Sequence, residues 1–367
     1  MNPFDIALAA AAVRLTLPLL LAALGELLSE RAGVINIGLE GMMLFGAYSG
    51  FMAAYATGSV SVGLLAGIAT GLAVGALMAF ISVNLRGDQI VVGVAINLLA
   101  VGVTMFLYRL QFQGSQPTTV KMEPYAIPVL SDIPWIGPAF FNQLPLVYLG
   151  YVLGPVVAYL LYRNRYGLML RAVGEKPAVL HSVGISVVRV QWSGVLAAGA
   201  LAGLGGAFLS VGQLGLFAEN MTAGRGFLAL AAVVFGQWRP YGVVAACCVF
   251  GFTDALQLRL QSMGALPIQL WWALSLIGAA VAAWAWWRRQ GDSAAASWPM
   301  LTVGGLVLAA GVAGAATTPA VALPSQVWLC LPYLASLFAL AAASRGGSDG
   351  KNTAPAMVGR PLEQFDR

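Results

Sequence analysis

A few polar side chains lie inside the apolar stretches of this sequence, and they are the first candidates for chemistry. Glu40 lies near the start of one apolar segment, Asn97 lies in another, and Asp254 lies near the end of a third. A charge at the centre of a bilayer costs about 2.5–3.5 kcal/mol on insertion scales, so each acid should face a partner or a cavity. For Glu40 and Asn97 two interpretations stay open: a structural bond within a helix bundle, or a place on a solute path.

No set of side chains has the spacing of an enzyme site. The P-loop pattern G-x-x-x-x-G-K-[ST] is missing, so the chain is not expected to use ATP by itself. His181 is the single histidine, and the three cysteines show no Cys-x-x-Cys spacing, so no metal site is predicted. We therefore expect a protein that is not an enzyme, with no catalytic residue and no cofactor of its own.

The composition indicates that lipid surrounds most of the chain. Of the 367 residues, 59% are hydrophobic and 9% are charged, whereas about 25% of an average soluble domain is charged. With about 20 apolar residues per crossing helix, there is room for about ten spans. The net charge of +5 comes from scattered loop residues, which favours topology signals over a nucleic-acid surface. We predict an all-α polytopic membrane protein with about 10–11 transmembrane or re-entrant helices.

The main polar interruption is RNRYGLMLRAVGEKPAVLHSVGISVVR, residues 163–189, which carries five basic residues and one acid. The positive-inside bias places this loop, 163–191, in the cytoplasm. Gly174 is expected to break the chain, and Pro177 and Gly184 bracket a predicted short helix over 178–183. Two interpretations stay open: the helix docks into a groove on a soluble partner, or the loop only sets topology.

Two further patterns concern helix packing. Glycines at every fourth position line one face of an expected span, where another backbone can approach closely; they are Gly63, Gly67, Gly71 and Gly75. The apolar core at 227–235 is too short to cross about 30 Å of hydrocarbon, so we expect a broken or re-entrant helix there.

Charge and proline content suggest the organisation of the chain. The proline-rich stretch 111–144 carries little charge and is expected to be an extracytoplasmic loop. Alternation of the spans then places the turns at Arg31 and Arg86 and the end of the chain in the cytoplasm. We predict one transmembrane domain over 1–343 and a flexible cytoplasmic tail over 344–367.

Three segments together resemble a known family. They are RAGVINIGLEGMMLFGAY (31–48), RYGLMLRAVGEKPAVLHSVGIS (165–186) and GRGFLALAAVVFGQWRP (224–240). They are similar to permease subunits of bacterial ABC importers, in the superfamily of the ribose and branched-chain amino-acid permeases. The nucleoside-type, or simple-sugar, branch looks most similar.

The resemblance implies a permease subunit, most similar to those for nucleosides, in the bacterial cytoplasmic (inner) membrane, where membrane lipid surrounds it. Its partners would be a separate ABC ATPase that binds the ATP, a second homologous permease in a heterodimer, and an extracytoplasmic substrate-binding protein or lipoprotein. No nucleic acid is implied. A sugar, a riboflavin-like compound or an amino acid is the alternative solute. A secondary transporter or channel that needs no ATPase, with Glu40 and Asp254 carrying protons, is the alternative class.

The resemblance also assigns residues. The stretch 171–184 matches the family's coupling segment, so contacts to the ATPase fall to Arg171, Gly174, Glu175, Lys176 and Pro177. The possible solute path comprises Asn36, Glu40, Asn97, Phe227 and Trp238, of which Asn97 comes from its place in a span alone. The sequence departs from the family where ALPIQLW (265–271) recurs as ALPSQVW (322–328), which predicts an extra two-span insertion at 265–321.

Overall fold

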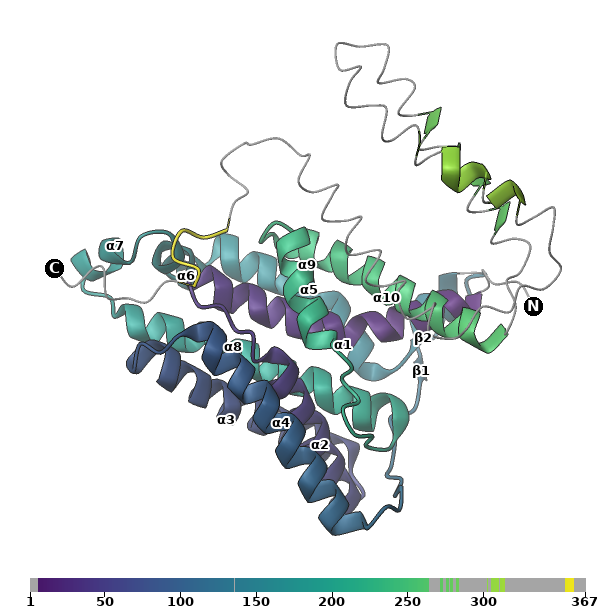
Figure 1. The fold of residues 1–367 in the computed structure, drawn as a ribbon, viewed down its shortest axis with the longest axis horizontal. Helices are drawn as coiled ribbons and strands as arrows, with labels where there is room; N and C mark the ends of the chain where they lie inside the picture. Colours follow the sequence, from purple (N-terminus) through teal and green to yellow (C-terminus); the bar gives the residue numbers. More distant parts are fainter. Residues whose placement is uncertain are drawn as a thin grey trace. The chain divides into compact units, whose positions relative to one another are not determined.

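The computed structural model describes residues 6–134, 136–263, 271–272, 275–276, 278–279, 282–283, 302, 305–309, 311–313 and 354–359. The chain divides into two compact units, one of residues 10–252 with 335–367 and one of residues 1–9 with 253–334. The first unit contains every residue proposed above for coupling or for a solute path. Its described part is almost entirely helical (Figure 1).

The helices are α1 (Ile6–Arg31), α2 (Leu39–Thr57), α3 (Val60–Ala79), α4 (Gln89–Phe112), α5 (Pro145–Arg163), α6 (Arg165–Glu175), α7 (Pro177–Ser182), α8 (Val187–Ala207), α9 (Arg225–Phe235) and α10 (Pro240–Met263). Most of them follow one another with short connections, and the longest connection in the described part up to α10 joins α4 to α5. Three π-helical segments are η1 (Phe80–Asn84), η2 (Gly137–Phe141) and η3 (Phe208–Leu214), of which η1 and η3 continue α3 and α8. The strands β1 (Tyr125–Ala126) and β2 (Asn142–Gln143) pair antiparallel within the 111–144 stretch.

Six helices in the described part are long and apolar enough to cross a bilayer. They are Ile6–Arg31, Val60–Asn84, Gln89–Phe112, Pro145–Arg163, Val187–Leu214 and Pro240–Ser262. The predicted class, an all-α polytopic membrane protein, is therefore confirmed. The predicted two-span insertion at 265–321 lies largely outside the described residues.

The glycine face of α3 lies against α8 and α2. A Cβ on Gly71 would overlap the carbonyl of Gly199, and a Cβ on Gly67 would lie 2.5 Å from the Cβ of Ala207. Gly63 meets the carbonyl of Gly50 on α2 in the same way, at 2.8 Å. Because glycine and alanine leave little side-chain volume between these backbones, the three helices pack more closely than larger side chains allow. This close packing forms the scaffold on which the remaining helices are placed.

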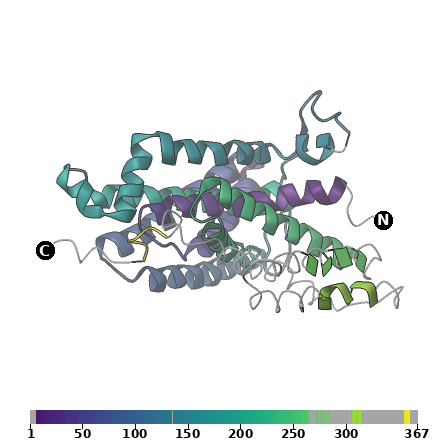
Figure 2. The same cartoon turned by 90° about the horizontal axis from the view of Figure 1, so that it is seen from above.

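The unit of residues 10–252 and 335–367 has two distinct ends (Figures 1 and 2). At one end, the turn at Arg86 lines a cavity with Pro177 and Gly184, so this turn lies beside α7. At the other end, the amide of Thr119 donates to the carbonyl of Gly215, just beyond η3, at 2.7 Å. The 111–144 stretch and the α6–α7 element therefore lie at opposite ends of the bundle.

Candidate functional site

The segment predicted for coupling forms two helices instead of one. Asn164 caps α6, because its side chain accepts from the amide of Tyr166 at 3.1 Å. Pro177 opens α7, as its fixed backbone angle favours at a first helical turn. Gly174 does not break the chain as predicted, because α6 continues through it to Glu175. Glu175 and Lys176 are exposed at the corner between the two helices.

Gly174 is where α6 meets the end of α1. A Cβ at this position would overlap the carbonyl oxygen of Arg31, so only glycine permits the approach. On its other side, the carbonyl of Gly174 accepts a 2.9 Å hydrogen bond from the amide of Met357. The side chain of Met357 is buried and lies near Gly33. The tail expected to be flexible thus contributes a packed segment, 354–359, that lies against α6 and the end of α1.

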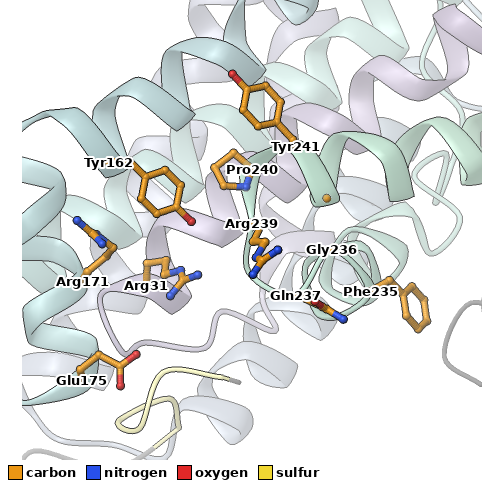
Figure 3. A pocket seen from close by; sticks show the side chains of 11 residues that line it. Arg31, Tyr162, Arg171, Glu175, Phe235, Gly236, Gln237, Arg239, Pro240 and Tyr241 are labelled. Carbon is orange, nitrogen blue, oxygen red and sulfur yellow. The ribbon is translucent and has the colours of Figure 1, made fainter. Parts of the chain in front are cut away.

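Beside this contact lies a cavity of about 860 Å³. Its lining includes the ends of α1, α5 and α6 and the start of α10, as Figure 3 shows, and its charged residues are Arg31, Arg171, Glu175 and Arg239. The guanidinium group of Arg171 lies over the ring of Tyr162, 5.1 Å from its centroid. The cavity therefore collects basic side chains from helices that are far apart in the sequence.

Trp238 joins the end of α9 to α1. Its backbone carbonyl accepts from Nε and Nη2 of Arg31, at 3.1 and 2.5 Å, and its indole N–H donates to the carboxylate of Glu30. Gln237 and Trp238 both have a φ of 53°, in the left-handed region that larger residues seldom adopt. The hydrogen bonds to α1 hold this backbone in place, so the turn after α9 is fixed to the end of α1.

Glu40 stabilises the other end of α9. Its carboxylate accepts from the amide of Gly224 at 2.9 Å and from the amide of Gly226 at 2.6 Å. These are two of the N–H groups that the first turn of a helix leaves without partners, and the helix dipole favours a negative charge there. With 11 residues, α9 is about 16 Å long, which is half of a bilayer core. The predicted broken helix thus begins at a carboxylate that α2 supplies.

Asn97 and Asn36 surround the start of α2. Asn97 accepts from the amide of Gly41 at 2.8 Å and donates to the carbonyl of Ile37 at 3.0 Å, which fastens α4 to α2. The backbone N–H of Asn36 donates to the carboxylate of Glu26 at 2.8 Å. Asn36, Glu40 and Asn97 therefore lie close together, and each bonds a neighbouring helix or loop.

The other residues proposed for the solute path lie elsewhere. Phe227 is on α9 and its side chain is 48% exposed in this chain, so it is available to a neighbour or to lipid. Trp238 lies at the far end of α9 from Glu40, in contact with Glu30. The five residues proposed for the path are thus divided between the two ends of α9.

Sequence reasoning missed three residues that connect these elements, namely Glu26, Glu30 and Arg31. Glu26 and Glu30 are buried although they lie on a predominantly apolar helix. Their four-residue spacing places two acids on one helix face, next to a basic residue at the helix end. This spacing is the feature of the sequence that could have identified the two acids. Only the fold shows that their partners are Asn36 and Trp238.

Together these contacts form a continuous connection through the unit. From α6 it passes through Gly174 to Arg31 on α1, then to Trp238, along α9 to Gly226, and on to Glu40. These contacts join α6 at the surface to the first turn of α9 inside the bundle. No group of three or more potential metal-ligating side chains gathers anywhere in the described residues.

Comparison with known proteins identifies the class of the chain. Residues 8–285 match the family described as branched-chain amino acid transport system / permease component. The chain belongs to this permease family. The resemblance drawn from the three sequence segments is thus confirmed. No solved structure shows a significant match to the permease.

Several named relatives are similar over most of their length. The putative glucose ABC transporter permease protein TsgC13 of Haloferax volcanii is 42% identical over 69% of this chain and 77% of its own. The nucleoside permease protein NupC of Lactococcus lactis is 37% identical, over 65% and 78%. The guanosine permease protein NupQ of Bacillus subtilis is 36% identical, over 66% and 78%. The chain is therefore an ABC transporter permease and a multi-pass membrane protein.

In each of these organisms a second permease protein also matches the chain, but less well. The identities are 27% in Bacillus subtilis, 25% in Lactococcus lactis and 28% in Haloferax volcanii. The permease thus resembles one member of each pair more than the other.

Proposed function

We propose that this permease is one of two transmembrane subunits of an ATP-driven importer and that a separate ATPase docks on α6 and α7. The observation that carries the proposal is the contact of Gly174 with the carbonyl of Arg31. A partner that moves α6 also moves the end of a helix long enough to span the bilayer. In this proposal the permease hydrolyses no ATP, and ATP binds only to the partner.

The orientation of the permease in the membrane is proposed from the distribution of charge. The Arg86 turn lies beside α7, and the tail segment 354–359 packs on α6. Basic residues gather at this end, and the positive-inside bias favours the cytoplasm for such an end. We therefore place α6, α7 and the C-terminal tail in the cytoplasm of a cell whose cytoplasmic membrane holds the permease. The 111–144 stretch then faces a binding protein or lipoprotein outside.

The mechanism follows the connection through α9. As the ATPase changes state, it changes the position of α6, and the contacts of Arg31 with Trp238 transmit the change to α9. The first turn of α9 lies beside Glu40, inside the bundle. The two positions of α6 must differ in their interaction energy with the ATPase for the path to open alternately to either side. Glu40 acts here as a helix cap that moves with α9.

The second permease is proposed from the pairs of relatives. Two permease proteins of each of the three organisms match this chain, and one of each two matches it better. This pattern favours a heterodimer over two copies of this chain. Size-exclusion and mass measurement of the purified transporter distinguish the two arrangements, because a homodimer contains a single permease mass.

Nucleosides are the solutes that we propose first. Two relatives whose names specify nucleosides or guanosine are 37% and 36% identical to the chain. Glucose is the second candidate, because the relative named for it is 42% identical. Uptake of labelled guanosine, with unlabelled glucose as competitor and then the reverse, decides between them in vesicles that contain all subunits. Inhibition of guanosine uptake by guanosine but not by glucose would establish the first choice.

The coupling assignment is tested with Glu175→Arg. Glu175 is exposed, so the chain should fold while the charge that meets the ATPase is reversed. We expect uptake and solute-stimulated ATP hydrolysis to fall by about tenfold or more, the effect of losing one or two charge-assisted contacts. The control is Asp132→Arg, a matched reversal of an exposed acid at the opposite end, which should leave ATPase binding and basal ATP hydrolysis unchanged. Normal ATPase binding and uptake in Glu175→Arg would refute the assignment.

The alternative of a secondary transporter is tested with the chain alone. Glu40 already accepts two backbone hydrogen bonds, which argues against a role as a proton carrier. Vesicles that contain this chain without an ATPase should show no solute flux under a pH gradient. Flux that depends on the gradient would favour the secondary-transporter class.

A further inference from the structure

The cavity of Figure 3 contains more positive than negative charge. Three arginines and one glutamate line it. Arg31 donates to a neutral carbonyl, and Arg171 lies over a neutral ring. Within the described residues, Nε of Arg171 is buried and makes no hydrogen bond. The charges of Arg31 and Arg171 are therefore bound to groups that do not neutralise them.

The arginines are close enough to affect one another. Arg171 and Arg239 both interact unfavourably with Arg31, whereas Tyr162 and Glu175 interact favourably with it, and of these two only Glu175 is an acid. Like charges at such separations repel more strongly beside protein than in water, because the effective dielectric constant is lower. An anion in the cavity would convert this repulsion into attraction.

The cavity also lies at the membrane surface. Arg31 is the last residue of α1, Tyr162 is next to the last residue of α5, and Pro240 is the first residue of α10. All three helices are long enough to span a bilayer, and their ends meet here. Tyr162 and Tyr241 are exposed at the rim, where tyrosine side chains favour the boundary between lipid and water. The first turn of α10 adds the positive end of a helix dipole.

We propose that this cavity binds a phosphate-bearing anion. The planar guanidinium group presents paired N–H donors that match phosphate oxygens, and Arg171 has a donor without a partner. The volume of about 860 Å³ exceeds the needs of a bare phosphate ion, so a phosphate with a further polar or apolar group fits. Basic pockets between transmembrane helices commonly bind phospholipid head groups. Anionic phospholipid and free phosphate share this chemistry, and the experiment separates them.

Occupation of the cavity would affect the proposed coupling element. Arg171 and Glu175 belong to α6, whereas Arg31 and Arg239 belong to the end of α1 and the start of α10. A phosphate bridging these arginines holds α6 against the spanning helices. The site itself is independent of which solute crosses, so its test uses binding and not transport.

The experiment uses the full chain, purified with its partner subunits in lipid nanodiscs. In one arm, native mass spectrometry counts the phosphatidylglycerol molecules that the transporter retains. The same count for phosphatidylcholine is the comparison. The other arm measures binding of radiolabelled inorganic phosphate in nanodiscs of phosphatidylcholine alone. We expect saturable binding in at least one arm, weakened about fivefold or more by Arg171→Gln and less by Arg171→Lys, which keeps the charge.

Lys121→Gln is the matched control, since it removes one positive charge from an exposed position at the opposite end of the bundle. It should bind as the wild type does. Retention of phosphatidylglycerol alone assigns the site to lipid, and binding of inorganic phosphate assigns it to a free phosphate compound. Arg239→Gln provides a second variant if Arg171→Gln does not assemble. Absence of saturable binding in both arms, or wild-type binding by these variants, would overturn the proposal.

Discussion

The carboxylate of Glu40 accepts a 2.6 Å hydrogen bond from the amide of Gly226, which joins α2 to the first turn of α9. A Cβ on Gly226 would overlap the backbone amide of Glu40. Position 226 therefore accommodates only glycine, and the carboxylate of Glu40 binds the amide that this close approach brings near. This contact fixes the position of α9. It also supplies an acceptor for an N–H group that the first turn of the helix would otherwise leave without a partner.

Replacing Glu40 with alanine should destabilise the chain. Hydrogen bonds to a charged group contribute about 1.5–3 kcal/mol each, and two are lost. We expect a lower unfolding temperature in detergent together with loss of uptake. The control for the unfolding temperature is Glu123→Ala, which removes an exposed acid in the 111–144 stretch. If Glu40 served only the solute, Glu40→Ala would change the KM of uptake and leave the unfolding temperature unchanged.

Replacing Gly71 with alanine should separate α3 from α8. The added Cβ would overlap the carbonyl of Gly199, which belongs to a rigid helix backbone. Overpacking of this kind costs about 1–3 kcal/mol, so the unfolding temperature should fall. Gly102→Ala on α4 is the matched control, because no atom lies within 4 Å of its added Cβ. Equal unfolding temperatures for the two variants would show that the α3–α8 packing is looser than described.

The contact between the tail and α6 predicts slow hydrogen exchange at Met357. Its amide is bonded to the carbonyl of Gly174, and its side chain is 4% exposed. Met357→Asp buries a charge and should release the segment, so that exchange at 354–359 becomes fast. Ala356→Asp, at an exposed neighbouring position, should leave exchange slow. Fast exchange already in the wild type would contradict this contact.

The pair of Arg109 and Glu219 predicts a pH dependence. Nε and Nη2 of Arg109 donate to the two carboxylate oxygens, at 2.6 and 2.8 Å. These hydrogen bonds lower the pKa of Glu219 below its ordinary value of 4.5. A lowered folded-state pKa stabilises the fold above the unfolded-state pKa, and this stabilisation disappears as the pH falls through the folded-state value.

Arg109→Gln should therefore lower the unfolding temperature slightly at pH 7, because the pair is exposed. The difference from the wild type should shrink as the pH falls below 4.5. Unfolding of both proteins at pH 7 and at a pH well below 4.5 provides the measurement. A difference that is the same at both pH values would mean that the ion pair does not form in solution.

Sequence patterns predicted what depends on composition and local spacing. Apolar length determined which segments are long helices, and the shortness of 227–235 predicted the broken helix that appears as α9. Pro177 indicated the start of α7. Gly174 misled local reasoning, because a glycine that breaks an isolated helix can also permit close contact between two helices. The residue type is the same in both cases, and only the neighbour differs.

The sequence by itself determined that the chain is a multi-spanning helical membrane protein, because membrane insertion and helix formation depend on runs of neighbouring residues. The permease class came from the resemblance of three segments to a known family. Only the tertiary structure decided the partners of the polar groups: Glu40 with the start of α9, Glu30 and Arg31 with Trp238, and Gly174 with the tail. Each of these contacts joins residues that are far apart in the chain. Their pairing is set by how the glycine-lined helices pack, which no local pattern specifies.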